Sequence, residues 1–253
     1  MSAETIEEEG QASFMTLPMT TTRPARNTPP RCAPRGLLLD FGSVISVSVF
    51  ERHCESERLL GLAEGTLTWL GPIDPATDPL WESMQREEIT ERDYWACRAA
   101  ELGDLVGEPG WDVMTMLHRI RQTDANAIIR PEMQHMMRVA RANGMRVGIL
   151  SNELELFYGS EMLAQMDVLA ETAMIVDASN TGILKPDARA YTQATQGLDL
   201  PPQEILFVDD QFRNIVGAVK AGLQTQHFDL RDIPGNLAAI AARLQLPAEG
   251  APR

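Results

Sequence analysis

The residues in this sequence that are best suited to chemistry follow short apolar runs. Leu37, Leu38 and Leu39 lead directly into Asp40, and Gly42 comes two residues later. This pattern predicts a short buried strand that delivers a carboxylate to a tight loop. Similar placements recur downstream, at Ser151 and Asn152, at Lys185 ahead of a predicted helix, and at Asp209 and Asp210.

These residue types together favour phosphoryl transfer. A carboxylate such as Asp40 can act as a nucleophile, and a lysine and a hydroxyl can hold phosphate oxygens. Clustered carboxylates require a hard cation such as magnesium to relieve their mutual repulsion. Taken singly, each residue also has a simpler interpretation as a helix cap, a turn residue or a solvated charge. It is improbable that polar residues of these types follow the predicted strands at all of these positions by chance.

A parallel sheet would bring these residues together. From Pro131 onward the pattern alternates between helices and strands, which indicates crossover helices between parallel strands. The carboxyl ends of parallel strands lie along one edge, where ligands bind. The fold class expected is therefore α/β with a Rossmann-like parallel sheet. Beyond the strand before Asp40, we expect strands within 145–152, 173–179, 204–210 and 223–230.

The rest of the chain divides by composition. Residues 1–34 are rich in Thr, Pro and Arg, and we expect a flexible tail there. Residues 35–46 and 129–253 form the predicted α/β core. Residues 47–128 read as a helical insertion, in which Thr90 and Asp93 resemble a capping box.

The overall charge limits the possible partners. The formal net charge is -14, from 36 acidic and 22 basic residues, which argues against nucleic acid and anionic membranes. No apolar run approaches the roughly 20 residues that span a bilayer. The three cysteines show no CxxC spacing, so we expect a cytoplasmic location. The oligomeric state is open.

Four segments resemble, in order and spacing, the motifs of the haloacid dehalogenase superfamily of hydrolases. They are LLLDFG, ILSN, GILKPDARAY and ILFVDDQFRN, and with the intervening elements they cover about residues 35–230. In that superfamily a helical cap is inserted between the first and second motifs, where this sequence has its helical insertion. REEITERDYW is also similar to a cap segment of a phosphatase-like branch that carries Asp-x-Gly in its first motif.

The resemblance implies specific roles at the phosphoryl group. Asp40 would be the nucleophile that forms an aspartyl-phosphate. Ser151 would hydrogen-bond the phosphoryl group, with Asn152 supporting it. Lys185 would neutralise charge on Asp40 and on the transferring phosphate.

The resemblance also implies a magnesium site. Asp40 and Asp210 would bind Mg²⁺ directly, and the backbone carbonyl of Gly42 would complete the shell. Asp209 would hold the ion through water or from farther out, and Asn214 would brace the loop.

One position departs from the pattern of most phosphatases in the superfamily. They carry a second aspartate two residues after the nucleophile as general acid and base, and here that residue is Gly42. General acid and base catalysis typically raises the rate about 100- to 10,000-fold, so we expect slow turnover or another proton donor. His53, Glu51 and Asp74 are the candidates, and His53 is also a candidate substrate contact. A surface histidine early in a helix is the simpler interpretation of His53.

Three functions remain open. The first is a magnesium-dependent phosphomonoesterase acting on a small phosphorylated metabolite through Asp40. The second is a 2-haloacid dehalogenase, disfavoured because a metal-free site has no reason to gather Asp40, Asp209 and Asp210. The third is a catalytically weak binding or regulatory protein, in which Gly42 marks lost activity. Phosphate release with magnesium, compared between the wild type and Asp40→Asn, separates them.

Overall fold

Five parallel strands form a sheet in the order β3-β2-β1-β4-β5. The structure is a computed structural model, and it describes residues 32–120 and 124–246. All five strands predicted from the sequence are present, which confirms the α/β class. The strands are β1 (Gly36–Leu39), β2 (Arg146–Ser151), β3 (Met174–Asp177), β4 (Ile205–Asp209) and β5 (Gln224–His227).

β1 lies at the centre of the sheet because it is apolar on both faces. Leu39 pairs with Ile149 of β2 and with Val208 of β4. Successive side chains alternate across a sheet, so Leu37 and Leu39 enter the core on one face and Leu38 enters the core on the other. All three leucines are fully buried.

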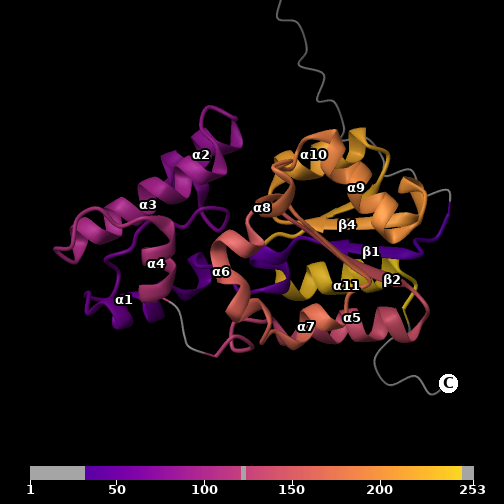
Figure 1. The fold of residues 1–253 in the computed structure, drawn as a ribbon, viewed down its shortest axis with the longest axis horizontal. Helices are drawn as coiled ribbons and strands as arrows, with labels where there is room; N and C mark the ends of the chain where they lie inside the picture. The colour runs from indigo at the N-terminus through magenta and orange to yellow at the C-terminus, as the bar shows by residue number, and fades with distance from the viewer. Residues whose placement is uncertain (1–31, 121–123, 247–253) are drawn as a thin grey trace, which may run out of the picture.

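Helices cover both faces of the sheet (Figure 1). On one face, α5, α7 and α11 contribute Met133, Val168 and Ile240 to the core. On the other, α9 and α10 contribute Tyr191 and Ala218. The helices that follow β1 and its loop in the core are α5 (Pro131–Ala142), α6 (Leu154–Leu163), α7 (Asp167–Ala170), α8 (Ala178–Thr181), α9 (Ala188–Leu198), η4 (Pro202–Glu204), α10 (Phe212–Lys220) and α11 (Ile233–Arg243).

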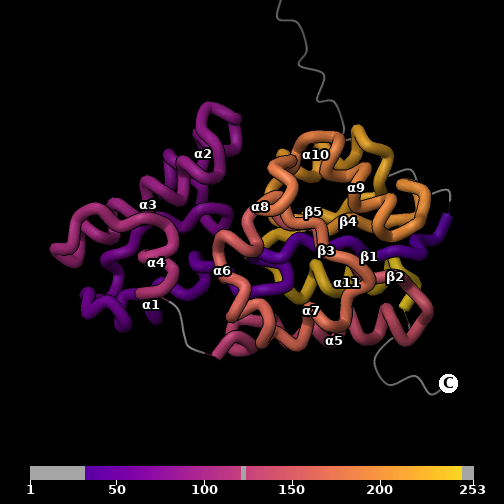
Figure 2. Tube along the Cα trace, in the orientation of Figure 1, coloured from indigo at the N-terminus to yellow at the C-terminus, as the bar shows by residue number. Residues whose placement is uncertain are grey.

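The residues between β1 and α5 are helical and have a hydrophobic cluster of their own, centred on Phe50, Trp69, Tyr94 and Trp95. We call residues 50–120 the cap segment. Figure 2 shows it beyond the end of the sheet toward which β1 runs. After the loop η1 (Phe41–Ile45), its elements are η2 (Phe50–Arg52), α1 (His53–Leu60), η3 (Pro75–Thr77), α2 (Pro79–Gln85), α3 (Glu91–Leu105) and α4 (Val113–Ile120).

The start of α3 matches the sequence prediction. Thr90 accepts a hydrogen bond from the backbone N–H of Asp93, and the Asp93 side chain accepts one from the backbone of Thr90. This capping box fixes where α3 begins and places Glu91 at its first position. The next residue, Arg92, forms an ion pair with Glu153, which follows β2 in the core.

Two other expectations concern the ends of the chain and membranes. Most of the tail predicted at residues 1–34 lies outside the described residues. None of the helices described is both long enough and apolar enough to cross a membrane.

Candidate active site

A buried ammonium group joins two carboxylates at the carboxyl edge of the sheet. Lys185 Nζ lies 2.8 Å from Asp40 Oδ1 and 2.7 Å from Asp209 Oδ2. Asp40 follows β1 and Asp209 ends the neighbouring β4, so the parallel register brings them side by side. The sequence prediction that these three residues converge therefore agrees with the geometry.

Burial shapes the charges of this cluster. It raises the pKa of Asp40 to about 7, although the Lys185 ammonium opposes this shift. Burial likewise raises the pKa of Asp210, and the neighbouring carboxylates of Asp209 and Asp40 raise it further. For Lys185, burial acts to lower the pKa, but Asp209 and Asp40 outweigh it and the pKa rises. The site is thus short of positive charge, and a bound cation would stabilise it.

The donor set fits a hard divalent cation. Carboxylate oxygens of Asp40, Asp209 and Asp210 lie within 4.8 Å of one another, and all three residues are buried. Oxygen ligands of this kind are what Mg²⁺ prefers. Of the three, Asp210 has no hydrogen bond to its carboxylate from the residues that the structure describes. It is the carboxylate best placed to bind an ion directly.

Both carboxylate oxygens of Asp209 accept hydrogen bonds from other core residues. Its Oδ1 accepts hydrogen bonds from the backbone N–H of Gln211, at 2.8 Å, and from Asn214 Nδ2, at 3.0 Å. Its Oδ2 accepts from Lys185 Nζ, at 2.7 Å, and from Asn214 Nδ2, at 3.2 Å. This pattern suits an outer position at the metal site, and it places Asn214 where the resemblance implied a brace.

Asn152 holds the backbone of the lysine. Its Oδ1 accepts a hydrogen bond from Lys185 N–H at 2.7 Å, and its Nδ2 donates to the Lys185 carbonyl at 3.3 Å. Its amide is therefore committed to positioning Lys185. Ser151, the last residue of β2, is buried beside it and lines the same cavity as Asp40.

That cavity has a volume of about 70 Å³, several times the ~10–15 Å³ that one water requires. It is much smaller than a typical ligand pocket of about 300–1,000 Å³. Such a space is of a size that suits a phosphoryl group. Its lining includes Asp40, Gly42, Ser151, Asn152, Lys185 and Asp210 from the core and Phe50, Trp81, Glu91 and Trp95 from the cap segment.

Gly42 has room for a side chain. Its φ of -62° and ψ of 135° are accessible to any residue, and a Cβ built there meets nothing within 4 Å. The lack of a carboxylate at this position is thus a property of the sequence and not a steric requirement. The role of the Gly42 carbonyl as a metal ligand stays a prediction.

The candidates named for the missing acid are not brought to the cavity. His53 is buried in the cap segment, with its ring centroid 4.4 Å from that of Trp69, and it is not among the cavity residues. Burial lowers its pKa. Glu51 accepts a hydrogen bond from Arg130 at 2.8 Å, and Asp74 is exposed on a loop. His53 is therefore corrected from a substrate contact to a packed residue of the cap segment, because its helix turns it toward Trp69.

Glu91 is a cavity residue that the sequence did not single out. Its carboxylate accepts hydrogen bonds from Asn152 Nδ2 at 3.1 Å, Gln211 Nε2 at 3.1 Å and Arg213 Nη2 at 3.2 Å. All three donors belong to the core. The capping box predicts where α3 begins, but the sequence pattern does not show which loops of the core the start of this helix contacts.

Arg92, which follows Glu91 in α3, forms an ion pair with a glutamate of the core. Arg92 Nε lies 2.7 Å from Glu153 Oε1, and the Glu153 side chain is buried. Glu91 and Arg92 together form what we call the clasp, because they tie the cap segment to the loops after β2 and β4. Glu91 and Glu153, one residue from each side of the clasp, line the small cavity.

Curated relatives match parts of this chain. A sesquiterpene phosphatase of Aspergillus oryzae is 26% identical over 58% of the chain and 71% of its own length. A phosphatase of Mycobacterium tuberculosis is 31% identical over 39% of the chain and 46% of its own length. The chain also matches acyl-CoA dehydrogenase family member 10 of Mus musculus, at 32% identity over 39% of the chain, but spans only 9% of that protein.

Solved structures share the fold at low identity. YfnB of Bacillus subtilis, in a structure bound to magnesium, is 15% identical with a TM-score of 0.63, over 85% of this chain and 100% of that one. The L-2-haloacid dehalogenase of Xanthobacter autotrophicus is 15% identical with a TM-score of 0.50, over 77% of each chain. A family model described as haloacid dehalogenase-like hydrolase matches residues 62–222. The chain therefore belongs to the haloacid dehalogenase-like hydrolases.

Proposed function

We propose that this hydrolase is a magnesium-dependent phosphatase of small phosphorylated metabolites. The observation that carries the proposal is the position of Lys185 Nζ, between Asp40 and Asp209, with Asp210 in the same group of carboxylates. Two of the matched relatives are named as phosphatases, which supports the same reading.

Asp40 is the proposed nucleophile. Its Oδ1 is held by the backbone N–H of Phe41 at 2.7 Å and by Lys185, which leaves Oδ2 for attack. A bond forms between Oδ2 and phosphorus while the bond from phosphorus to the leaving oxygen breaks. Water then attacks phosphorus and releases phosphate, which restores Asp40. Mg²⁺ bound by Asp40 and Asp210 would supply charge stabilisation for the transferring group.

Proton supply sets the expected rate. The leaving oxygen gains negative charge as its bond to phosphorus breaks, and Gly42 offers no acid to protonate it. Glu91 is the cap carboxylate that lines the cavity, but it already accepts hydrogen bonds from three core side chains. We therefore propose slow turnover of alkyl phosphates and faster turnover of aryl phosphates, because a phenolate needs no proton to leave.

The cap segment is proposed to open and close over the site. Because the clasp ties the cap segment to the loops beside Asp40, we propose that it releases Asn152, Gln211, Arg213 and Glu153 when the substrate enters. Closure would then exclude water from Asp40 during transfer.

We also propose that the core and cap divide at residues 46–47 and 128–129, as the sequence suggested. The three cysteines are free, which is consistent with our proposal that the protein functions in a reducing compartment such as the cytoplasm.

The test is phosphate release from an aryl phosphate, with and without magnesium, by the wild type and by Asp40→Asn. We expect magnesium-dependent release by the wild type and a loss of at least about 1,000-fold in the variant. Equal release by both proteins would show that Asp40 does no chemistry. Release of halide from a 2-haloacid without magnesium would replace the proposal with the dehalogenase function.

A further inference from the structure

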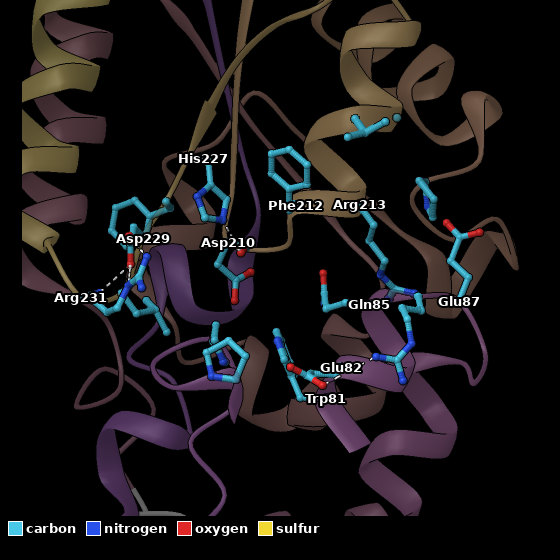
Figure 3. A pocket seen from close by; sticks show the side chains of 18 of the residues that line it. Trp81, Glu82, Gln85, Glu87, Asp210, Phe212, Arg213, His227, Asp229 and Arg231 are labelled. Atoms are coloured by element: carbon cyan, nitrogen blue, oxygen red, sulfur yellow. Dashed lines mark hydrogen bonds and ion pairs between the residues drawn. The ribbon is translucent and has the colours of Figure 1, made fainter. Parts of the chain in front are cut away.

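A second, much larger cleft lies between the cap segment and the core. Its volume is about 880 Å³, within the usual range for ligand pockets of about 300–1,000 Å³. Helix α2 and the preceding loop form one wall, and α10 with the loop after β5 forms the other. Figure 3 shows Asp210, His227 and Phe212 on the core side, facing Trp81 and Gln85 across the opening.

The cleft adjoins the small cavity at two residues. Trp81 and Asp210 line both spaces, one from the cap segment and one from the core. His227 Nε2 lies 2.9 Å from the backbone carbonyl of Asp210 and so supports the loop at this junction. A substrate with its phosphoryl group beside Asp40 can therefore extend past Asp210 into the cleft.

The core wall of the cleft exposes two apolar side chains of one helix. Phe212 is 64% exposed and Val216 is 37% exposed, and both line the cleft from one face of α10, four residues apart. Pro186 and Leu230 line the cleft as well. In a chain with a net charge of -14, exposed apolar side chains grouped beside the Asp40 site indicate a ligand surface.

The charged groups in the cleft are largely neutralised. Each of its three guanidinium groups pairs with a carboxylate, and Lys220 is the one further cation among the described residues of the lining. The described lining therefore does not offer a cluster of free cations that would recognise a second phosphate or a polyanion. The pairs are Arg86 with Glu88 at 2.8 Å, Arg213 with Glu91 at 3.2 Å and Arg231 with Asp229 at 2.6 Å.

We infer that the cleft binds the leaving group of the substrate, and that this group is a bulky, apolar, uncharged alcohol. The preferred substrate is thus the phosphate monoester of a hydrophobic alcohol. Phe212 and Val216 would contact its hydrocarbon part, while Asp40 and Lys185 act on the phosphoryl end. The inference rests on the proposed phosphatase function and adds the substrate class.

The experiment compares 4-methylphenyl phosphate with 4-hexylphenyl phosphate in the presence of magnesium. The two phenols have nearly the same acidity, so a difference in kcat/KM reports binding of the alkyl chain and not leaving-group chemistry. We expect wild-type kcat/KM to be at least about tenfold higher for the hexyl compound, because each buried methylene adds to binding.

The double variant Phe212→Ser, Val216→Asn should remove that preference, so that kcat/KM for the hexyl compound falls to the value for the methyl compound. The matched control is Val219→Ser, because Val219 is 57% exposed on the same helix but does not line the cleft. The control should retain the wild-type preference. Thermal unfolding of each variant verifies that it is folded, and the single variant Val216→Asn replaces the double one if it is not.

The outcomes separate this inference from the proposed function. If the wild type hydrolyses neither compound, the phosphatase proposal fails, and the substrate class fails with it. If it hydrolyses both equally well, or if the double variant keeps the hexyl preference, the inference about the cleft is overturned and the phosphatase proposal stands.

Discussion

Glu91, at the start of α3, accepts a hydrogen bond from Arg213 of α10 across 3.2 Å, although the two residues are 122 positions apart. The same carboxylate accepts from Asn152, which in turn holds the backbone of Lys185. One residue of the cap segment is thus linked to the lysine that joins Asp40 and Asp209. This chain of contacts therefore connects the cap segment to the backbone of Lys185.

Glu91→Gln should loosen the cap segment. The amide keeps the shape of the side chain but loses the ion pair to Arg213, so we expect the clasp to open more often. Hydrogen exchange should become faster at the backbone amides of Asn152 and Arg213, and kcat should fall about tenfold. Glu101→Gln is the matched control, because Glu101 pairs with Arg98 inside the cap segment on the same helix. Unchanged exchange in Glu91→Gln would contradict the role of the clasp.

Asp210→Asn should raise the magnesium requirement. The Asp210 carboxylate is the free member of the three-carboxylate group, so an amide there removes a charged ligand without breaking a described hydrogen bond. We expect the magnesium concentration for half-maximal activity to rise at least about tenfold. The control is Asp104→Asn, an exposed acid on α3. An unchanged requirement in Asp210→Asn would remove that residue from the metal site.

Gly42→Asp should speed the release of poor leaving groups. The backbone at Gly42 accepts any residue, and a new side chain meets open space. A carboxyl group there could protonate the leaving oxygen, so we expect alkyl phosphate turnover to rise at least about tenfold. Gly42→Asn has the same shape without the acid and serves as the control. A rise of equal size in both variants would mean that proton transfer is not what limits the rate.

The buried imidazole of His53 should make stability depend on pH. Burial lowers its pKa below the ordinary 6.5, while charges nearby act in both directions, Glu57 and Asp78 raising it and Arg98 lowering it. The unfolded chain therefore binds a proton more readily than the folded one. The contribution of His53 to the free energy of unfolding is fully present above about pH 6.5 and is lost as the pH falls toward the folded pKa.

Urea unfolding at several pH values measures this effect. His53→Phe should flatten the dependence between pH 6.5 and more acidic values. His118→Phe, at an exposed position of α4, should leave it unchanged. If wild type and His53→Phe lose stability in parallel as the pH falls, His53 is not the group responsible.

The sheet could be predicted from the sequence because its signals are local. Leu37, Leu38 and Leu39 form an apolar run that predicts a buried strand, and the parallel direction of the strands follows from the alternation of strands and helices. The convergence of Asp40, Lys185 and Asp209 follows from that topology. Each strand is thus predicted from the residues next to one another in the sequence, and the order of strands and helices then brings the distant site residues together.

The parts that could not be predicted depend on how the cap segment meets the core. Nothing near Glu91 in the sequence indicates that it contacts Gln211 and Arg213. His53 looked like a surface residue or a substrate contact, but the packing of α1 against Trp69 decides its place. The apolar face made by Phe212 and Val216 shows itself only once α10 is placed opposite α2.

The most direct test of the central claim is chemical trapping of the phosphorylated enzyme. The protein is mixed with magnesium and an aryl phosphate, quenched, treated with borohydride, and analysed by mass spectrometry of its peptides. Borohydride reduces an aspartyl-phosphate to homoserine, so the account predicts homoserine at position 40 and none in a sample without substrate. Phosphate released over many turnovers, with the aspartate at position 40 never converted, would contradict it.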